Sequence, residues 1–308
     1  MLVCAALNPS LDKLFACADV VPGAIHRPEH FVARAGGKGL NVARVAHALG
    51  AEVHAVALLA GHNGDRLAAM LEEEGVRVDA VRAAGETRSS LSVLSRATGA
   101  LTEFYESGDA ESAPAWPALC AALRARAGEA SWVAVTGSLL PGIAPDAVGP
   151  LVAEAGGAGA RVAVDQDGPA LAAALAARPA LVKVNEEEAR MLTGAGRDEA
   201  AAALSALAGP QAAVMVTLGA DGALLREPDG TTWRGDLEER GPYAVGSGDA
   251  FLGAALVALE ARPDDLPGAL AAGLGAGTAN ALEPGAGSLD PARARDLGVR
   301  ARARLVRT

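Results

Sequence analysis

The sequence is poor in lysine, cysteine and aromatic residues. Of its 27 basic residues only Lys13, Lys38 and Lys183 are lysine, and aromatic residues make up 3% of the chain. The three cysteines are odd in number and show no metal-type spacing, which argues against both a disulfide framework and a zinc site. A reduced, cytoplasmic setting is therefore expected.

The sequence also lacks a positive net charge and a long apolar run. Its formal net charge of −10 argues against nucleic acid or an anionic membrane surface as the main partner. No apolar run reaches transmembrane length, and the segment "MLVCAALNPSLDK" has no basic region of the kind that begins a signal peptide. Hydrophobic residues make up 51% of the 308 residues, which is enough for a buried core. The sequence therefore predicts a folded, soluble protein.

Short apolar runs alternate with helical patterns along most of the chain. The intervening segments, such as "GLNVARVAHALG" and "GDRLAAMLEEEG", have apolar residues at helical spacing and end on glycine. The apolar runs are rich in valine and leucine and begin at Leu2, Val53, Trp132, Arg161, Ala180 and Ala212. This alternation predicts an α/β fold with a doubly wound, mostly parallel sheet and helices on both faces. In such sheets ligands bind at the carboxyl ends of the strands.

Two segments interrupt this alternation, at about residues 11–35 and 88–108. The first has no helical pattern and contains the alternating stretch "HFVAR", and the second alternates around Thr98 and Gly99 as a hairpin would. We expect them to form a small β layer at one edge of the main sheet, as a lid, a structural flap or a dimer contact. No linker is long enough to separate two domains, so residues 1–308 are expected to form one domain.

The stretch "PYAVGSGDAFLGAAL", residues 242–256, places a glycine turn directly before a helical pattern. Backbone amides at a helix start form an anion site, and Asp249 beside them is a candidate general base. An acidic residue at a helix start also has a purely structural explanation, because it offsets the positive end of the helix dipole. The motif alone leaves both interpretations open.

Three further motifs follow predicted strands or precede predicted helices. In "ARAGGKGLNVAR" paired glycines, Lys38 and Asn41 stand at a helix start, which suits an anionic or polyhydroxylated ligand. In "KVNEEEA" Asn185 and Glu188 lie three residues apart and could hold the water shell of Mg²⁺, although acidic first turns are common in helices. The segment "TLGADGALL" is a strand, a glycine turn and a second strand.

The order of these motifs resembles the PfkB branch of the ribokinase-like sugar kinases. The resemblance runs from "NPSLD" at Asn8 to "GAG" at Gly285 and includes "AGGKGLNVAR", "GETR", "TGSL" and "VGSGD". These motifs are most similar to those of the hexose-phosphate kinases, namely 1-phosphofructokinase and tagatose-6-phosphate kinase. The resemblance implies a kinase that uses ATP and Mg²⁺ and has a ribokinase-like fold with a β lid.

The resemblance also implies roles for individual residues near the transferred phosphoryl group. The amides of Gly246, Ser247 and Gly248 are expected to form an anion hole, and Asp249 is expected to take the proton from the sugar hydroxyl. The residues expected to contact ATP are Lys183, Asn185, Glu188, Thr217, Gly219 and Gly222. The residues expected to hold Mg²⁺ are Glu188 and Asp165.

On the sugar side, the resemblance implies a phosphate held by cations and hydroxyls held by polar residues. The cations are Lys38, Arg88 and Arg27. The other residues expected to contact the sugar phosphate are Asp12, Gly36, Gly37, Asn41 and Ser138. In this family the lid also tends to build a homodimer.

The favoured function is phosphorylation of the 6-hydroxyl of fructose 1-phosphate, which gives fructose 1,6-bisphosphate. Transfer to C1 of tagatose 6-phosphate or fructose 6-phosphate is the nearest alternative. Ala244 and "DQDG" at residues 165–168 depart from the family pattern, which leaves an inactive sugar-phosphate sensor as an alternative of another class. A nucleotide-dependent oxidoreductase is disfavoured, because no GxGxxG turn follows a predicted strand.

Overall fold

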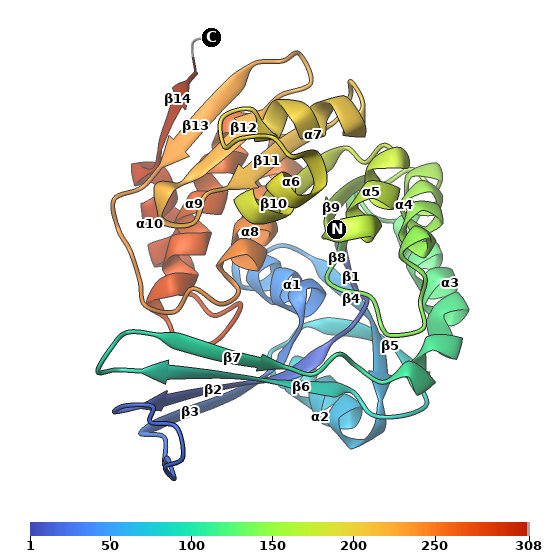
Figure 1. Ribbon diagram of the computed structural model, residues 1–308. Helices are drawn as coiled ribbons and strands as arrows, with labels where there is room; N and C mark the ends of the chain where they lie inside the picture. The colour runs from blue at the N-terminus through green and yellow to red at the C-terminus, as the bar shows by residue number, and fades with distance from the viewer. Residues whose placement is uncertain (307–308) are drawn as a thin grey trace.

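The computed structural model describes residues 1–306, which form one large and one small β-sheet with helices around the large one (Figure 1). The large sheet has ten strands in the order β14-β13-β12-β11-β10-β9-β8-β1-β4-β5, and the small sheet has four in the order β3-β2-β6-β7. This arrangement confirms the predicted α/β fold with a doubly wound, mostly parallel sheet.

The centre of the large sheet consists of parallel strands, and an antiparallel extension completes one edge. The parallel strands are β1 (Leu2–Ala6), β4 (Val53–Ala60), β5 (Arg77–Ala83), β8 (Trp132–Thr136), β9 (Arg161–Asp165), β10 (Leu181–Asn185) and β11 (Ala213–Thr217). The antiparallel strands are β12 (Ala223–Arg226), β13 (Thr232–Asp236) and β14 (Arg302–Leu305). The six apolar runs of the sequence correspond to β1, β4, β8, β9, β10 and β11, because a strand covered on both faces is apolar throughout.

Helices cover the two faces of this sheet in two groups. One face carries α3 (Trp116–Ala127), α4 (Val148–Gly157), α5 (Gly168–Ala176), α6 (Glu186–Thr193) and α7 (Ala200–Ala208). The other carries α1 (Lys38–Ala48), α2 (Gly61–Glu73), α8 (Ser247–Ala261) and α9 (Leu266–Leu282), with α10 (Pro291–Arg300) packed against α9. Short 3₁₀ turns occur at η1 (Ala110–Ala115), η2 (Pro145–Ala147) and η3 (Gly219–Asp221). Among residues 1–306, no helix has the length and apolar character needed to cross a membrane.

The two faces take alternate side chains of each central strand. In β1, Val3 and Ala5 belong to the core beneath α3 and α4, whereas Leu2 and Cys4 belong to the core beneath α1 and α8. This alternation follows from the two-residue period of a strand. Both cores are therefore built from the same continuous apolar runs.

The small sheet stands apart from the large one beside α1 and α2 (Figure 1). It contains β2 (Ser10–Cys17), β3 (His30–Gly36), β6 (Arg88–Ser95) and β7 (Leu101–Tyr105). Strands β6 and β7 form the predicted hairpin, with Gly99 at a positive φ of 70° in its turn. We refer to these four strands as the lid. Chain segments that the sequence marked as irregular thus assemble into one β layer.

Helix α1 lies unusually close to β1 at Gly39. A Cβ atom at this position would lie 2.3 Å from the carbonyl oxygen of Ala5, so the contact requires glycine. Gly39→Ala is therefore expected to push α1 away from the sheet and to lower the free energy of unfolding by about 1–3 kcal/mol. Chemical denaturation measures this loss.

Gly128→Ala is the matched control for this prediction. Gly128 ends α3 with helical dihedral angles and has open space around it, so alanine fits there. We expect the control to change the free energy of unfolding by less than about 0.5 kcal/mol. Equal effects of the two variants would contradict the close approach of α1 to β1.

Candidate active site

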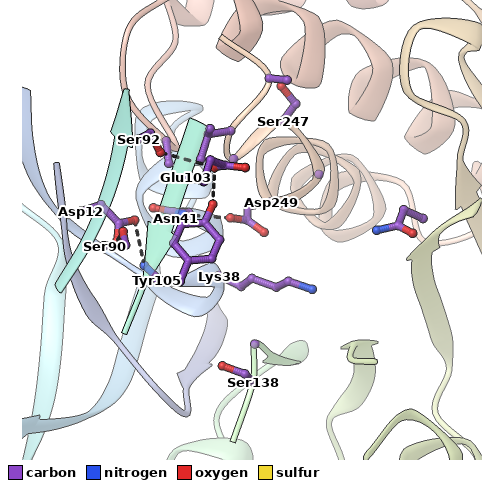
Figure 2. Close-up of a pocket in the computed structure, with 18 of the residues that line it drawn as sticks. Asp12, Lys38, Asn41, Ser90, Ser92, Glu103, Tyr105, Ser138, Ser247 and Asp249 are labelled. Carbon is purple, nitrogen blue, oxygen red and sulfur yellow. Dashed lines mark hydrogen bonds between the residues drawn. The ribbon is translucent and has the colours of Figure 1, made fainter. Parts of the chain in front are cut away.

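A cleft of about 1200 Å³ lies between the carboxyl ends of the parallel strands and the inner face of the lid. Lys183 and Asn185 at the end of β10 and Thr217 at the end of β11 line its floor. Figure 2 shows lid residues such as Asp12 and Tyr105 on one side of this space, with Asp249 on the other. The position agrees with the general placement of ligand sites in open α/β sheets.

Helix α8 begins at the centre of the cleft with the glycine turn of the GSGD motif. Gly246 caps the helix in the left-handed conformation, with φ of 77°, and a Cβ there would lie 2.7 Å from Ala286. Gly248 lies on the helix's first turn above Lys183, whose Nζ would be 2.7 Å from a Cβ at that position. The N–H of Ser247 donates to the carbonyl oxygen of Ala244, 3.1 Å away. The turn therefore brings backbone, without side-chain bulk, to the wall of the cleft.

Asp249 lies in the first turn of α8 and is buried, with 7% of its surface exposed. Its Oδ2 accepts a hydrogen bond from Nδ2 of Asn41, 2.8 Å away (Figure 2). Burial and the nearby charge of Asp165 raise the pKa of Asp249 to about 6, against the opposing effects of Lys38, Lys183 and Asn41. A carboxylate with such a pKa is ionised at neutral pH and can still accept a proton.

Two of the three lysines of the chain meet at one buried carboxylate. Asp165, at the end of β9, has no exposed surface; its Oδ1 lies 2.8 Å from Nζ of Lys38 and its Oδ2 lies 2.5 Å from Nζ of Lys183. Burial opposes the ionised form, but the two lysines outweigh it and lower the pKa of Asp165. The carboxylates of Asp165, Glu188 and Asp249 in turn raise the pKa of Lys38 despite its burial.

This pairing involves two residues that the resemblance assigned to ligands, Lys38 to the sugar phosphate and Asp165 to Mg²⁺. Lys38 runs away from Asp12 and Tyr105 (Figure 2), and its charge is already balanced by Asp165 and by Glu188 at 3.5 Å. Its ammonium group therefore lies by the end of β9 and the start of α6, and not toward the lid residues Asp12 and Tyr105. Both oxygens of Asp165 are paired with ammonium groups, so this carboxylate does not fit direct coordination of Mg²⁺.

The lid contributes a row of polar side chains across its four strands. Strand pairing places Arg34, Asp12, Ser90 and Tyr105 side by side, one on each strand, and all four line the cleft. Ser90 donates to Oδ1 of Asp12 over 2.5 Å, and Ser10 donates to the same oxygen. The row therefore presents to the cleft a carboxylate that two serine hydroxyls hold in place.

Arg88, at the start of β6, lies beside this row with its charge unbalanced. Its Nε donates to the carbonyl oxygen of Asn8 at 3.3 Å, and its Nη1 donates to that of Glu106 at 3.1 Å. Among residues 1–306, no carboxylate forms a salt bridge with it. Two carbonyl groups therefore orient this guanidinium, and although Asp12 and Glu106 lie near enough to act on its charge, neither forms a salt bridge with it.

The loop and strand ends opposite the lid carry the residues expected to contact nucleotide. Asn185 and Glu188 form a reciprocal cap of α6, since Glu188 N–H donates to Asn185 Oδ1 and Asn185 N–H donates to Glu188 Oε2, each over 2.8 Å. These two residues therefore have a structural role as the cap of α6. Glu188 also faces Lys38 in the cleft. Thr217, Gly219 and Gly222 line the same end of the cleft.

Of the residues expected from the sequence, most are gathered around this cleft. Ser138 lines it and receives a hydrogen bond from Asn8 Nδ2 at 3.2 Å, and Gly37 lies against Asp12, to whose Oδ2 its N–H donates at 3.3 Å. Gly36 leaves no room for a side chain, because a Cβ there would meet the Asp12 carboxylate. Arg27 lies instead in the exposed loop between β2 and β3, away from the cleft residues.

Several lid residues that line the cleft were not expected from the sequence, among them Arg34, Ser90, Glu103 and Tyr105. The signal that could have found them is the two-residue alternation of "HFVARAG", "RSSLS" and "LTEFY", which puts polar residues on one face. Tyr105 donates to Glu103 Oε1, and Ser92 donates to the same oxygen at 3.4 Å. The pairing partner of each strand had to be known before these residues could be placed together.

A divalent cation fits the cleft only with help from substrate. Residues 1–306 contain no cluster of three or more His, Cys, Asp or Glu side chains suited to a metal ion. Mg²⁺ commonly keeps several waters and binds through one or two carboxylates together with substrate phosphates. Glu188, at the cleft wall with its side chain 15% exposed, fits that kind of site.

Known proteins resemble this chain in both sequence and fold. Residues 5–293 match the model of the pfkB family of carbohydrate kinases. The chain is 32% identical over 265 residues to a 1-phosphofructokinase of Xanthomonas campestris, covering 82% of each chain. It is 32% identical over 286 residues to ATP-dependent 6-phosphofructokinase isozyme 2 of Escherichia coli, covering 91% of this chain and 92% of that one. The crystal structure of phosphofructokinase-2 from Escherichia coli with fructose 6-phosphate superposes with a TM-score of 0.84 at 27% identity, over 97% of this chain and 98% of that one.

The two lysines around Asp165 lead to a prediction about stability. Asp165→Asn removes the only charge that both ammonium groups contact, and Lys183 is itself 4% exposed. We expect the free energy of unfolding to fall by about 3–5 kcal/mol, because a buried charge is left unpaired. Chemical denaturation of Asp165→Asn and of Asp167→Asn, an exposed neighbour, checks this. Similar stability of the two variants would contradict the ion-pair role of Asp165.

Proposed function

Because the chain belongs to the pfkB family of carbohydrate kinases, which transfer a phosphoryl group to a sugar hydroxyl, we propose that it converts fructose 1-phosphate and ATP to fructose 1,6-bisphosphate and ADP. One observation carries the proposal. The buried Asp249 lies at the glycine-capped start of α8, in the same cleft as a lid face with a buttressed carboxylate and an unbalanced arginine. These three features suit a base, a sugar and a phosphate.

In this proposal Asp249 takes the proton from the 6-hydroxyl as the oxygen attacks the γ-phosphorus of ATP. The backbone at Gly246, Ser247 and Gly248 receives the charge of the transferred group at the start of α8, where a helix favours anions. Lys38 lies near Asp249 and adds a positive charge on this side. Phosphoryl transfer depends mainly on positioning and charge stabilisation, which these groups supply.

The lid holds the sugar in this proposal. Asp12, oriented by Ser10 and Ser90, accepts hydrogen bonds from sugar hydroxyls. Arg88 holds the phosphate on C1, because its guanidinium is oriented by two carbonyl groups and is not neutralised within residues 1–306. Lys38 lies near Asp249 and points away from the lid, so its position assigns it to the phosphates of ATP in this proposal.

The opposite end of the cleft takes the nucleotide. Residues that line it and would contact ATP are Lys183, Asn185, Glu188, Thr217, Gly219 and Gly222. Mg²⁺ would be held by Glu188 together with phosphate oxygens and water, and it would neutralise phosphate charge. Asp165 contributes by holding Lys38 and Lys183.

We also propose that the lid forms a homodimer. Its edge strands carry apolar side chains that are exposed in one chain, Phe31 at 55% and Phe104 at 60%, and the loop between β2 and β3 exposes Ile25 at 86%. Arg27 lies in the same loop. Apolar residues gathered on one projecting layer favour an interface between proteins.

The nearest alternative is phosphorylation of the 1-hydroxyl of fructose 6-phosphate or tagatose 6-phosphate. The similarity to the Escherichia coli 6-phosphofructokinase favours it, since the identity equals that to a 1-phosphofructokinase. All three substrates present one phosphate and a free hydroxyl at the far end of a ketohexose. An inactive sensor is the alternative of another class, and any ATP-dependent turnover excludes it.

A panel of sugars tests the choice of substrate. We expect fructose 1-phosphate to have a higher kcat/KM than fructose 6-phosphate, tagatose 6-phosphate or unphosphorylated fructose, measured by coupled release of ADP. Arg88→Met should lower kcat/KM for the sugar phosphate by about 10- to 100-fold, because charge-assisted hydrogen bonds to phosphate are lost.

Unphosphorylated fructose is the control in this experiment. Its weak turnover should be the same in wild-type protein and in Arg88→Met, because it has no phosphate for Arg88 to bind. An equal loss with both sugars would mean that Arg88 does not hold the phosphate. Best turnover of fructose 6-phosphate would favour the alternative substrate.

The role of Asp249 as the base leads to a prediction about pH. The carboxylate must be ionised to accept a proton, so kcat/KM of the wild type should fall by about tenfold per unit below the pKa of about 6. Asp249→Asn should lower kcat by about 10²- to 10⁴-fold and remove this acid limb. Steady-state assays from pH 5 to pH 9 measure both effects, with the exposed Asp264→Asn as control.

The raised pKa of Asp249 also leads to a prediction about stability: activity should rise with pH, whereas the contribution of Asp249 to stability should fall. The pKa of Asp249 in the folded chain, about 6, lies above its ordinary value of 3.8, so this group stabilises the fold below 3.8 and loses that contribution as pH rises through 6. Asp249→Asn should therefore have a higher Tm than the wild type at pH 8 and no such gain at pH 3.5.

Near-normal kcat in Asp249→Asn would contradict the assignment of Asp249 as the base.

A further inference from the structure

A chain of hydrogen bonds leads from Asp249 to a buried arginine that does not face the cleft. We propose that Arg44 is a positioning residue, which orients the amide of Asn41 so that the amide donates to the carboxylate of Asp249. The inference rests on the proposed role of Asp249 as the base. It assigns a part in catalysis to a residue that touches neither sugar nor nucleotide in the proposal.

The three residues lie on two packed helices. Asn41 and Arg44 are one turn apart on α1 and therefore share a face of that helix, which packs against α8. Nη1 of Arg44 donates to Oδ1 of Asn41 over 3.1 Å, and Nδ2 of Asn41 donates to Oδ2 of Asp249 over 2.8 Å. All three are buried, with exposed fractions of 6% for Arg44, 3% for Asn41 and 7% for Asp249.

Arg44 has little freedom to move within this site. Its Nε donates to Oε2 of Glu74 over 2.6 Å, and its Nη2 donates to the carbonyl oxygen of Ala35. The three nitrogens of the planar guanidinium thus have separate partners. Glu74, at the end of α2, and Ala35, on lid strand β3, therefore define the direction of the N–H group that faces Asn41.

The chemistry of this donor decides the orientation of the amide. An asparagine amide can rotate by half a turn with almost no change in shape, but its two ends are chemically opposite. A guanidinium only donates hydrogen bonds, so the oxygen of Asn41 must face Arg44 and its NH₂ group must face Asp249. In the reverse orientation, oxygen would face the carboxylate and NH₂ would face N–H groups. Arg44 therefore specifies the productive orientation.

This orientation favours the ionised form of Asp249. Other charged groups also act on the carboxylate, namely Lys38 from α1, Asp165 from β9 and Lys183 from β10. Among the opposing influences, Asn41 supplies a direct hydrogen bond, which holds one carboxylate oxygen in place and leaves the other for the sugar hydroxyl. Loss of this bond should raise the pKa of Asp249 and loosen the base.

The experiment compares Arg44→Met, Asn41→Ala and the double variant in the full chain. Methionine keeps an unbranched apolar stem and removes every donor. The pKa of Asp249 is read from the ¹³C carboxyl shift, assigned by its loss in Asp249→Asn, and from the acid limb of kcat/KM with the best sugar of the panel. We expect Arg44→Met to raise the pKa of Asp249 by about one pH unit in each of these two measurements. In the Asn41→Ala background the same substitution should cause no further shift.

Arg295→Met is the matched control, because Arg295 contacts α1 at the carbonyl oxygen of Leu49 and is exposed. It should leave the ¹³C titration unchanged. Arg44→Lys retains charge and one donor and should recover part of the shift; it also serves if Arg44→Met does not fold, as judged by thermal melting. For Arg44→Lys, a pKa of Asp249 between the values of the wild type and of Asn41→Ala supports the proposal. A pKa equal to that of Asn41→Ala overturns it.

Two results with Arg44→Met would also overturn the proposal. One is an unchanged Asp249 titration in folded Arg44→Met. The other is an equal shift in the Asn41→Ala background, which would mean that Arg44 acts through its charge and not through the amide. If Asp249→Asn kept normal kcat, the proposed base would be wrong, but the ¹³C titration would still test the hydrogen-bond chain.

Discussion

The centre of the cleft depends on one buried carboxylate that two lysines share. Asp165 ends β9 in the parallel part of the sheet, Lys38 starts α1 on one face, and Lys183 lies on the neighbouring strand β10. Burying a lone carboxylate at this depth would cost free energy. Burying either lysine ammonium group without Asp165 would cost free energy as well. Together the three groups fix the start of α1 against the floor of the cleft and set the electrostatic environment in which Asp249 has a raised pKa.

A second constraint comes from the lid. Its strand register aligns a polar row that faces the cleft, with Asp12 held by two serine hydroxyls and Arg88 held by two carbonyl groups at its edge. The carboxylate and the arginine are oriented before any ligand binds, which reduces the ordering that binding would require. Lys38 and Arg88 have the same charge but different roles in the proposal, because only Lys38 is neutralised by neighbouring carboxylates.

The family and the fold leave the substrate undecided, since one fold carries many functions. In the proposal, a few polar groups on the lid and their distance from Asp249 determine which sugar phosphate is the substrate. The link from Ala35 on β3 through Arg44 and Asn41 to Asp249 joins the lid to the proposed base by hydrogen bonds. In the proposal, sugar binding and base orientation therefore involve the same part of the structure.

The sequence by itself determined the α/β alternation, the glycine-capped start of α8 and the two segments of the lid. Each of these depends on residues close in the chain, through apolar periodicity or the conformations open to glycine. Only the tertiary structure decided which charges meet, because Lys38 is 127 residues from Asp165 and Asn41 is 208 residues from Asp249. The family resemblance grouped Lys38 with Arg88, whereas the fold pairs Lys38 with Asp165. The lid row was hidden for the same reason, since strand pairing is a long-range property that local pattern does not contain.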